Sequence, residues 1–459
     1  MLLALSLALA CHGPTTDDSG PTGDTAPTAA PLRPAEPADW AAPGAVDAAA
    51  FPSGVLSGDA SAQGVILAVR TDVIDLTVVV MAQDGQAWTE VARQSVTRDK
   101  GSRTAQVTIG GLAADTAHSF AFYAGDPDAG AARSAVGRFR TALDDSGYRQ
   151  LTVASTSCLG GDEPWPSLSA AAARHPDLFA NLGDVVYADG ATDLEGYRSY
   201  WDAAMLQQGM VDMGTATSFV STWDDHEVAN NWYAEDLLPG QYEAAMQAYR
   251  ESLPQGTGPT GGIWRQQHWG TVLDVFVLDS RSERDLASGK YLSDAQMAWL
   301  EQGLQDSTAT FKLILSSVPV TDLSDMLGTA AADDRWQGWP TSRDEILSFI
   351  DDNQVTGVLW LSGDVHFAMV ASVGIPGSGD PGEHQWEVAA GPGGSTNNIA
   401  ADLYENDFSH YLTMFSDWNT VMLTFDPGLG TVTVEYLGDD GGTLDRLVLD
   451  PVTGTVVVP

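Results

Sequence analysis

Residues 177–190 read DLFANLGDVVYADG, and this stretch decides the class of fold that the sequence predicts. The run from Leu178 to Leu182 has the length and the apolar content of a buried strand. It ends on a carboxylate, Asp184, and a phenol, Tyr187, follows shortly after. Polar side chains just beyond the carboxyl ends of strands build the functional sites of α/β domains. The stretch therefore predicts an α/β domain with a polar site at the end of this strand.

Three other apolar runs end in the same way. They are LTVASTS before Cys158, SFVSTW before Asp224, Asp225 and His226, and VLWLSG before Asp364 and His366. A single carboxylate at a strand end is equally well explained as a turn former. Four such ends together favour one shared site, because an apolar core has no need of them.

The wider pattern divides the chain into two folded parts. From residue 148 to residue 459, strand-like runs alternate with helix-like runs such as AAAARHP at 170–176 and LSDAQMAWLEQGLQDS at 292–307, where Ser293 or Asp294 can cap the helix. Residues 46–142 hold short apolar or alternating runs separated by Gly, Asp and Ser. That pattern is typical of a small all-β domain of the immunoglobulin or fibronectin type.

The first 45 residues have a different character. Residues 1–11, MLLALSLALAC, are too short an apolar run to span a membrane and resemble the core of a secretion signal. Cys11 stands where a bacterial lipoprotein carries its lipid, which predicts an exported protein, in the periplasm, at the cell surface or in the medium. Residues 12–45, rich in Pro, Thr, Gly, Asp and Ala, predict a disordered linker. Cys158 is the only other cysteine, so no disulfide is expected.

The composition excludes some partners. The 459 residues include 21 basic and 62 acidic side chains, and the formal net charge is −41. Such a surface repels nucleic acid and anionic membranes, so we expect neither of them to bind to it. A solvated acidic face with no specific role explains most of this charge. We expect the protein to be a monomer.

The mixture of ligand types predicts a pair of metal ions. Carboxylate and imidazole suit divalent cations, whereas phenolate, thiolate and carboxylate together suit Fe(III) or a mixed pair. Two bridged metals are the usual clamp for phosphoryl transfer to water. We expect Asp184 to bridge the ions and Tyr187 to bind one of them. Cys158 and Tyr187 also have a structural explanation that involves no metal. Cys158 could be a small buried apolar residue, and Tyr187 could be a packed aromatic ring.

Five motifs, in this order, resemble those of the PhoD-type alkaline phosphatases. They are SC at 157–158, GDVVY at 183–187, WDDHEVANN at 223–231, LDSR at 278–281 and LSGDVH at 361–366. The stretches LSDAQMAWLEQGLQDS, SVPV and DRWQGWPTSRDEIL agree with the same family, and FPSGVLSGDASAQGVIL at 51–67 resembles its amino-terminal domain. The resemblance covers residues from about 51 to at least 398.

The resemblance implies a calcineurin-like metallophosphoesterase core, which is an αββα sandwich of two packed sheets flanked by helices. It also implies a tyrosinate-bound Fe(III), as in purple acid phosphatases, with Ca²⁺ alongside. The implied iron ligands are Cys158, Asp184, Tyr187 and His366, and the implied calcium ligands are Asp184, Asp225 and Asp364, with Asp224 and Asn231 as further candidates.

The expected reaction is hydrolysis of phosphate esters by a metal-bound hydroxide. His226 is expected to protonate the leaving alkoxide or to hold a phosphate oxygen. Arg281 is expected to grip the phosphate, with a salt bridge to Asp279 or Glu283 as an equal alternative. The alternative functions are a phosphodiesterase or phospholipase D-like activity, and a non-catalytic surface protein that binds cations.

Overall fold

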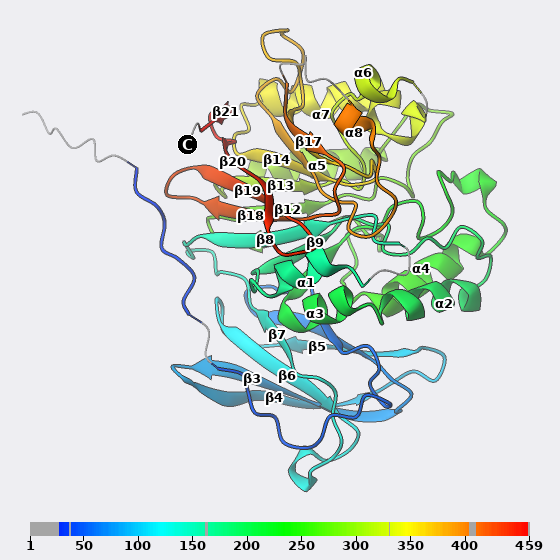
Figure 1. Cartoon of the computed structure of the whole chain (residues 1–459), viewed down its shortest axis with the longest axis vertical. Coiled ribbons are helices and arrows are strands. Elements are labelled where there is room, and N and C mark those ends of the chain that lie inside the picture. The colour runs from blue at the N-terminus through cyan, green and yellow to red at the C-terminus, as the bar shows by residue number, and fades with distance from the viewer. Residues whose placement is uncertain (1–26, 36–37, 161–163, 330, 404–409, 458–459) are drawn as a thin grey trace, which may run out of the picture.

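The computed structural model describes residues 27–35, 38–160, 164–329, 331–403 and 410–457. Two large sheets lie face to face at the centre, helices cover them on both outer sides, and a smaller β-domain completes the lower end in Figure 1. The predicted signal segment 1–11 lies outside the described residues.

The first large sheet has ten strands, and its three central strands run parallel. Their order is β21 (Thr455–Val456), β20 (Thr443–Asp450), β19 (Thr431–Leu437), β18 (Thr420–Asp426), β8 (Leu151–Thr156), β9 (Leu178–Asn181), β10 (Ser218–Ser221), β1 (Val55–Gly58), β2 (Gly64–Arg70) and β5 (Thr104–Gly110). Because β8, β9 and β10 are parallel neighbours, their carboxyl ends meet at one edge.

The second large sheet has seven strands. Their order is β11 (Arg265–Trp269), β12 (Leu273–Val277), β13 (Phe311–Leu315), β14 (Val358–Ser362), β16 (Trp386–Ala389), β15 (Ala368–Ser372) and β17 (Tyr411–Phe415). Alternate side chains of its parallel strands enter two cores, since successive residues of a strand point to opposite faces. Leu313 and Leu359 face the first sheet, whereas Ile314 and Trp360 face the helices.

The helices form the two outer layers. Against the first sheet lie α1 (Pro166–Ala172), α2 (Leu194–Ala204), α3 (Gln208–Ala216) and α4 (Gln241–Ser252), and beyond the second sheet lie α5 (Asp294–Asp306) and α7 (Pro340–Asp352), with the short α6 (Ser324–Leu327) and α8 (Ala400–Leu403) beside them. The predicted cap of α5 is Ser293, whose hydroxyl accepts the Gln296 N–H at 3.2 Å. The αββα sandwich predicted from the resemblance is confirmed. No helix in the described ranges is long and apolar enough to cross a membrane.

The amino-terminal part is a β-sandwich, as predicted. A four-stranded sheet, with the order β4 (Ala87–Thr97), β3 (Asp75–Asp84), β6 (Ala117–Tyr123) and β7 (Gly137–Arg140), packs on β1, β2 and β5. One feature was not expected. Strand β1 also pairs in parallel with β10, with Ser57 opposite Ser218, so one face of the sandwich continues the ten-stranded sheet. Hydrogen bonds of the backbone therefore join the two parts into one sheet.

The described part of the predicted linker is not a free tether. The Ala30 N–H donates to Asp426 Oδ1 at 2.9 Å, and the Pro31 carbonyl accepts the Gln150 N–H at 2.8 Å. Further along, the Ala38 carbonyl accepts the Trp88 indole N–H at 2.8 Å. A segment with few apolar side chains can still dock, because its backbone groups find partners along the folded body.

One buried histidine of the sandwich predicts acid sensitivity. The ring of His118 on β6 stacks on Phe139, with 4.7 Å between the ring centroids. Burial, assisted by the positive charge of Arg140, lowers the pKa of His118 from 6.5 to about 4. Protonation therefore favours the unfolded chain between these two pH values. The free energy of unfolding should lose about 3 kcal/mol from this group as pH falls from 6.5 to 4.

The variant His118→Phe tests this prediction, because it keeps a stacked ring and removes the titrating group. Urea unfolding at several pH values should show that the variant gains about 3 kcal/mol relative to the wild type between neutral pH and pH 4. A stability difference between H118F and wild type that stays constant with pH would contradict the prediction.

Candidate metal centre

The candidate ligands lie at strand ends of both large sheets. Cys158 follows β8, Asp184 follows β9, and Asp225 follows β10, so three come from the parallel centre of the first sheet. Asp364 and His366 follow β14 of the second sheet. The two sheets therefore contribute to one site from opposite sides of the central core.

Four of these residues have a left-handed backbone. The φ angle is +53° at Cys158, +54° at Asp184, +67° at Asp364 and +61° at His366. Residues other than glycine rarely adopt such angles, and the strain persists where the surrounding structure imposes it. The tight turns aim side chains from strand ends into the site.

The first group of candidate ligands consists of Cys158, Asp184 and His366. Each residue offers one ligand atom, and these three atoms all lie within 4.8 Å of one another. The Cys158 Sγ is 3.6 Å from Asp184 Oδ2. The Tyr187 hydroxyl joins them, at 3.0 Å from His366 Nε2 and 3.4 Å from Asp184 Oδ2. His366 Nδ1 lies 2.6 Å from the Thr396 carbonyl oxygen, and a carbonyl oxygen can only accept a hydrogen bond. The ring proton therefore belongs on Nδ1, which leaves Nε2 as the ligand atom.

The other two groups are dominated by carboxylates. One contains Asp184, Asp225 and His226, and the other contains Asp224, Asp225 and Asp364. Three buried oxygens of these groups have no hydrogen-bond partner in the described structure, namely Asp184 Oδ1, Asp224 Oδ2 and Asp225 Oδ1. Buried acceptors without donors are costly, so these oxygens fit cations.

The electrostatics agree with this interpretation. Burial, followed by the charges of Asp224 and Asp225, raises the pKa of Asp184 well above its usual range. Burial and the charge of Asp334 do the same for the pKa of Asp364. Burial also raises the pKa of the Cys158 thiol and of the Tyr187 phenol, with Asp184 as the next cause in each case. Bound cations would offset this concentration of negative charge.

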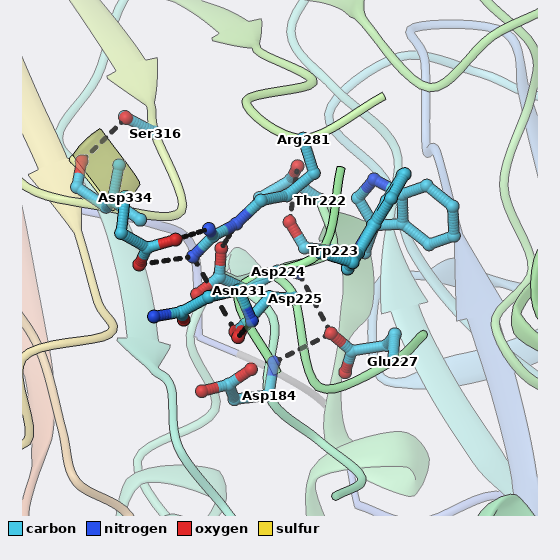
Figure 2. Close-up of polar contacts among 12 residues, drawn as sticks. Asp184, Thr222, Trp223, Asp224, Asp225, Glu227, Asn231, Arg281, Ser316 and Asp334 are labelled. Atoms are coloured by element: carbon cyan, nitrogen blue, oxygen red, sulfur yellow. Dashed lines mark hydrogen bonds and ion pairs between the residues drawn. The ribbon is translucent and has the colours of Figure 1, made fainter. Parts of the chain in front are cut away.

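The salt bridge predicted as an alternative for Arg281, to Asp279 or Glu283, is wrong, because its guanidinium pairs with other carboxylates. Its side chain is fully buried, and its Nε lies 2.5 Å from Asp224 Oδ1. Its terminal nitrogens bind Asp334, as Figure 2 shows, and one of them lies 3.6 Å from Asp225 Oδ1. The guanidinium thus faces carboxylates, and neither Asp279 nor Glu283 is its ion-pair partner. Arg284, 3.2 Å from Asp334 Oδ1, extends the same network.

His226 lies at the edge of the cluster. Its Nδ1 is 2.7 Å from Asp189 Oδ1, and its ring stacks on Tyr187 at a centroid distance of 4.1 Å. Burial lowers the pKa of His226, but its hydrogen bond to the Asp189 carboxylate and the charge of Asp225 outweigh burial and bring the pKa to about 9. The ring is therefore oriented and able to carry a proton beside the ligands.

Three functional residues were not singled out from the sequence. Glu227 accepts three backbone N–H groups of the ligand loops, Asp334 balances Arg281, and Asp189 orients His226. Burial raises the pKa of Glu227 to about 7, against the opposing effect of its N–H donors. All three stand inside motifs or stretches quoted above. Only the adjacency of Glu227 and Asp189 to candidate site residues pointed to them.

Two facing mixed sheets with these ligands at their strand ends define a metallophosphoesterase. The chain belongs to the PhoD-like phosphatase family, whose model matches residues 152–435. The model of the PhoD-like phosphatase N-terminal domain matches residues 38–143. The fold and the family predicted from the sequence are thereby confirmed.

Individual relatives support the same assignment. Alkaline phosphatase D of Bacillus subtilis (strain 168) is 25% identical over 278 residues, which are 49% of this chain and 47% of that protein. The match thus spans about half the length of this curated relative. Among solved structures, PhoD aligns over 92% of this chain and 93% of its own, with 21% identity and a TM-score of 0.78. Purple acid phosphatase PPD1 from yellow lupin (Lupinus luteus) aligns over 87% of this chain and 74% of its own, with 12% identity and a TM-score of 0.62. At these identities the two structures establish the fold alone.

Proposed function

We propose that this protein hydrolyses phosphoric esters in a reaction that depends on bound metal ions. The observation that carries the proposal is the convergence of three ligand groups, which are linked by Asp184 and Asp225. Within these groups, three buried carboxylate oxygens have no hydrogen-bond donor in the described structure. Family membership supports it, since the family is described as phosphatases. No apolar core or turn requires this arrangement.

The ligand chemistry favours two kinds of ion. Thiol, phenol, carboxylate and imidazole from Cys158, Tyr187, Asp184 and His366 match Fe(III). The oxygen-only group of Asp224, Asp225 and Asp364 matches Ca²⁺, which prefers oxygen ligands. Asp184 belongs to the first group, and it shares a further group with Asp225, which belongs to the oxygen-only group. Asp184 would therefore serve as the bridge between the two ions.

The residues of the chain have distinct parts in the proposed reaction. When bound, the ions would polarise the phosphoryl oxygens and lower the pKa of a water molecule. His226, held by Asp189, is placed to donate a proton to the departing ester oxygen. Arg281 neutralises Asp224 and keeps that carboxylate in place, so it acts on the ligands rather than on the phosphate.

An assay with two ester classes tests the activity. Purified protein is incubated with a phosphomonoester and with a phosphodiester, with added Ca²⁺ and with a chelator. We expect hydrolysis that the chelator abolishes and that metal restores. Faster turnover of the diester would favour a phosphodiesterase or phospholipase D-like activity. Bound metal without turnover of either ester would instead indicate a cation-binding surface protein.

Colour provides an independent prediction about the iron. A tyrosinate bound to Fe(III) absorbs visible light, so the purified protein should be coloured, and elemental analysis should find iron and calcium. Tyr187→Phe should remove the visible band while the fold persists, because the ring remains packed between Gly160 and His226. A colourless wild-type protein with full activity would reject Tyr187 as an iron ligand.

The proposed location is outside the cytoplasm, with a lipid on Cys11. The apolar run that ends at Cys11 motivates this proposal. Mass spectrometry of protein from the native host should show a chain that begins at a lipid-modified Cys11. Cys11→Ser should release the protein from the membrane fraction. Size-exclusion chromatography with light scattering tests the proposed monomer.

A further inference from the structure

We propose that Glu227 is a positioning residue that fastens together the two loops bearing Asp184 and Asp224, so that the metal site is assembled before metal arrives. The inference rests on the proposed metal-dependent function, because it concerns the same site. Glu227 touches ligands only through their backbone, and none of the metal-holding groups among the described residues includes it.

The carboxylate of Glu227 is fully buried and receives three backbone donors. Its Oε2 accepts the N–H of Asp184 at 3.0 Å and the N–H of Asp224 at 2.9 Å. Its Oε1 accepts the N–H of Val185 at 2.8 Å. Figure 2 shows the carboxylate of Glu227, which itself follows β10, beside Asp184, which follows β9. Each loop carries candidate ligands, so one side chain connects two of the ligand-bearing loops of the first sheet.

The two loops also approach each other closely. Gly183 has a φ angle of +99°, and a Cβ atom there would lie 2.3 Å from the Asp224 backbone nitrogen. Any larger residue would push the loops apart. The three amides belong to the buried residues Asp184, Val185 and Asp224, and buried N–H groups without partners are costly. Glu227 is the acceptor that makes this packing possible.

The two carboxylate oxygens of Glu227 together meet all three donors. A carboxylate has two oxygens with several acceptor sites and no proton to donate. A glutamine of the same length would turn an NH₂ group toward at least one N–H. An aspartate would fall short of the amides by one methylene. Glu227→Gln is therefore a specific test, because it changes the hydrogen-bonding groups while the volume of the side chain stays the same.

Glu387 on β16 provides a matched control. It is also fully buried, and its two oxygens accept the backbone N–H groups of Val320 at 2.9 Å and Thr321 at 2.8 Å. It belongs to none of the metal-holding groups in the described structure. Glu387→Gln therefore causes the same chemical change at a loop without candidate ligands.

The experiment measures metal retention in wild-type protein, E227Q and E387Q. Each protein is dialysed against a graded series of chelator concentrations, and bound iron and calcium are measured by mass spectrometry. We expect E227Q to lose metal at 10- to 100-fold lower chelator strength than wild type, and E387Q to follow wild type within about twofold. Saturating metal should restore most of the kcat of E227Q. Retention of metal by E227Q like that of wild type, or an equal loss in E387Q, would overturn the proposal.

A second measurement needs no variant. Hydrogen exchange of the wild-type chain should show the amides of Asp184, Val185 and Asp224 protected both with metal and after chelation. Free exchange of these amides after chelation would show that metal, and not Glu227, holds the loops. This result keeps the proposal testable even if E227Q fails to fold.

The two proposals can fail separately. If wild-type protein hydrolyses no phosphoric ester while E227Q still loses metal, the proposed function fails and the role of Glu227 stands. If wild-type protein is active and E227Q retains both its metal and its turnover, the role of Glu227 fails and the proposed function stands.

Discussion

Replacing Asp184 by asparagine is expected to remove bound metal and to lower kcat/KM for phosphate esters on the order of a thousandfold, about 4 kcal/mol. Asp184 belongs to two of the three ligand groups, so its loss affects the site more than the loss of a single-group ligand. Elemental analysis and steady-state kinetics measure both effects.

The same variant should be more stable than wild type once both are stripped of metal. Burial and the charges of Asp224 and Asp225 raise the pKa of Asp184, which means that its ionised form destabilises the metal-free fold. A neutral amide removes this repulsion at neutral pH. Thermal unfolding in chelator should therefore place the Tm of D184N above that of wild type, the opposite order from that with metal present.

Asp177, at the other end of the same strand, is the matched control. It is buried like Asp184, but its Oδ1 pairs with Arg149 at 2.9 Å and its Oδ2 accepts the Thr152 N–H at 2.9 Å. Removing one partner of a buried ion pair costs about 3–5 kcal/mol of stability. Asp177→Asn should therefore lower stability while the folded protein keeps its metal and its kcat. Full activity in D184N would reject Asp184 as the bridging ligand.

Replacing His226 by alanine is expected to lower kcat for alkyl phosphates on the order of 100- to 10,000-fold, with the metal retained. Asp189 orients the ring, and the stacking on Tyr187 holds it beside the ligands. A group that protonates the leaving oxygen matters most when that oxygen is a poor leaving group. The loss should therefore shrink for an aryl ester such as nitrophenyl phosphate, whose phenolate departs without a proton.

The pair formed by His268 and Asp274 is the control for this variant. His268 Nδ1 lies 2.6 Å from Asp274 Oδ1, much as His226 lies beside Asp189, but on β11 and β12 away from the ligands. His268→Ala should leave kcat unchanged for both ester types. If H226A loses metal, His226 acts as a ligand, and if its loss is equal for alkyl and aryl esters, it does not act as the acid.

Much of the site could be predicted from the sequence because the ligand-bearing turns are local. Cys158, Asp184 and Asp364 each stand within two or three residues of the strand that delivers them, and strands are recognisable by their apolar runs. The order of the motifs was enough to identify the family. The strand-and-helix pattern was likewise enough for an α/β domain and for the amino-terminal β-sandwich, whereas the αββα sandwich followed from the family resemblance.

The errors have a common origin in contacts between distant segments. A salt bridge from Arg281 to its neighbours Asp279 or Glu283 was one of the two predictions for this residue, yet it binds Asp224 and Asp334, which are 57 and 53 residues away in the chain. The pairing of β1 with β10 was missed for the same reason, since the residues of a strand do not specify which distant strand will lie beside it.

By itself, the sequence determined the kinds of side chain available, the strand ends that carry them and the family, since these depend on residue identity and short-range periodicity. Only the tertiary structure decided which carboxylates remain without donors, which are neutralised by Arg281 and which one, Glu227, joins the loops. The physical reason is that a buried charge takes its role from whatever surrounds it. At this site those neighbours come from the ends of two different sheets.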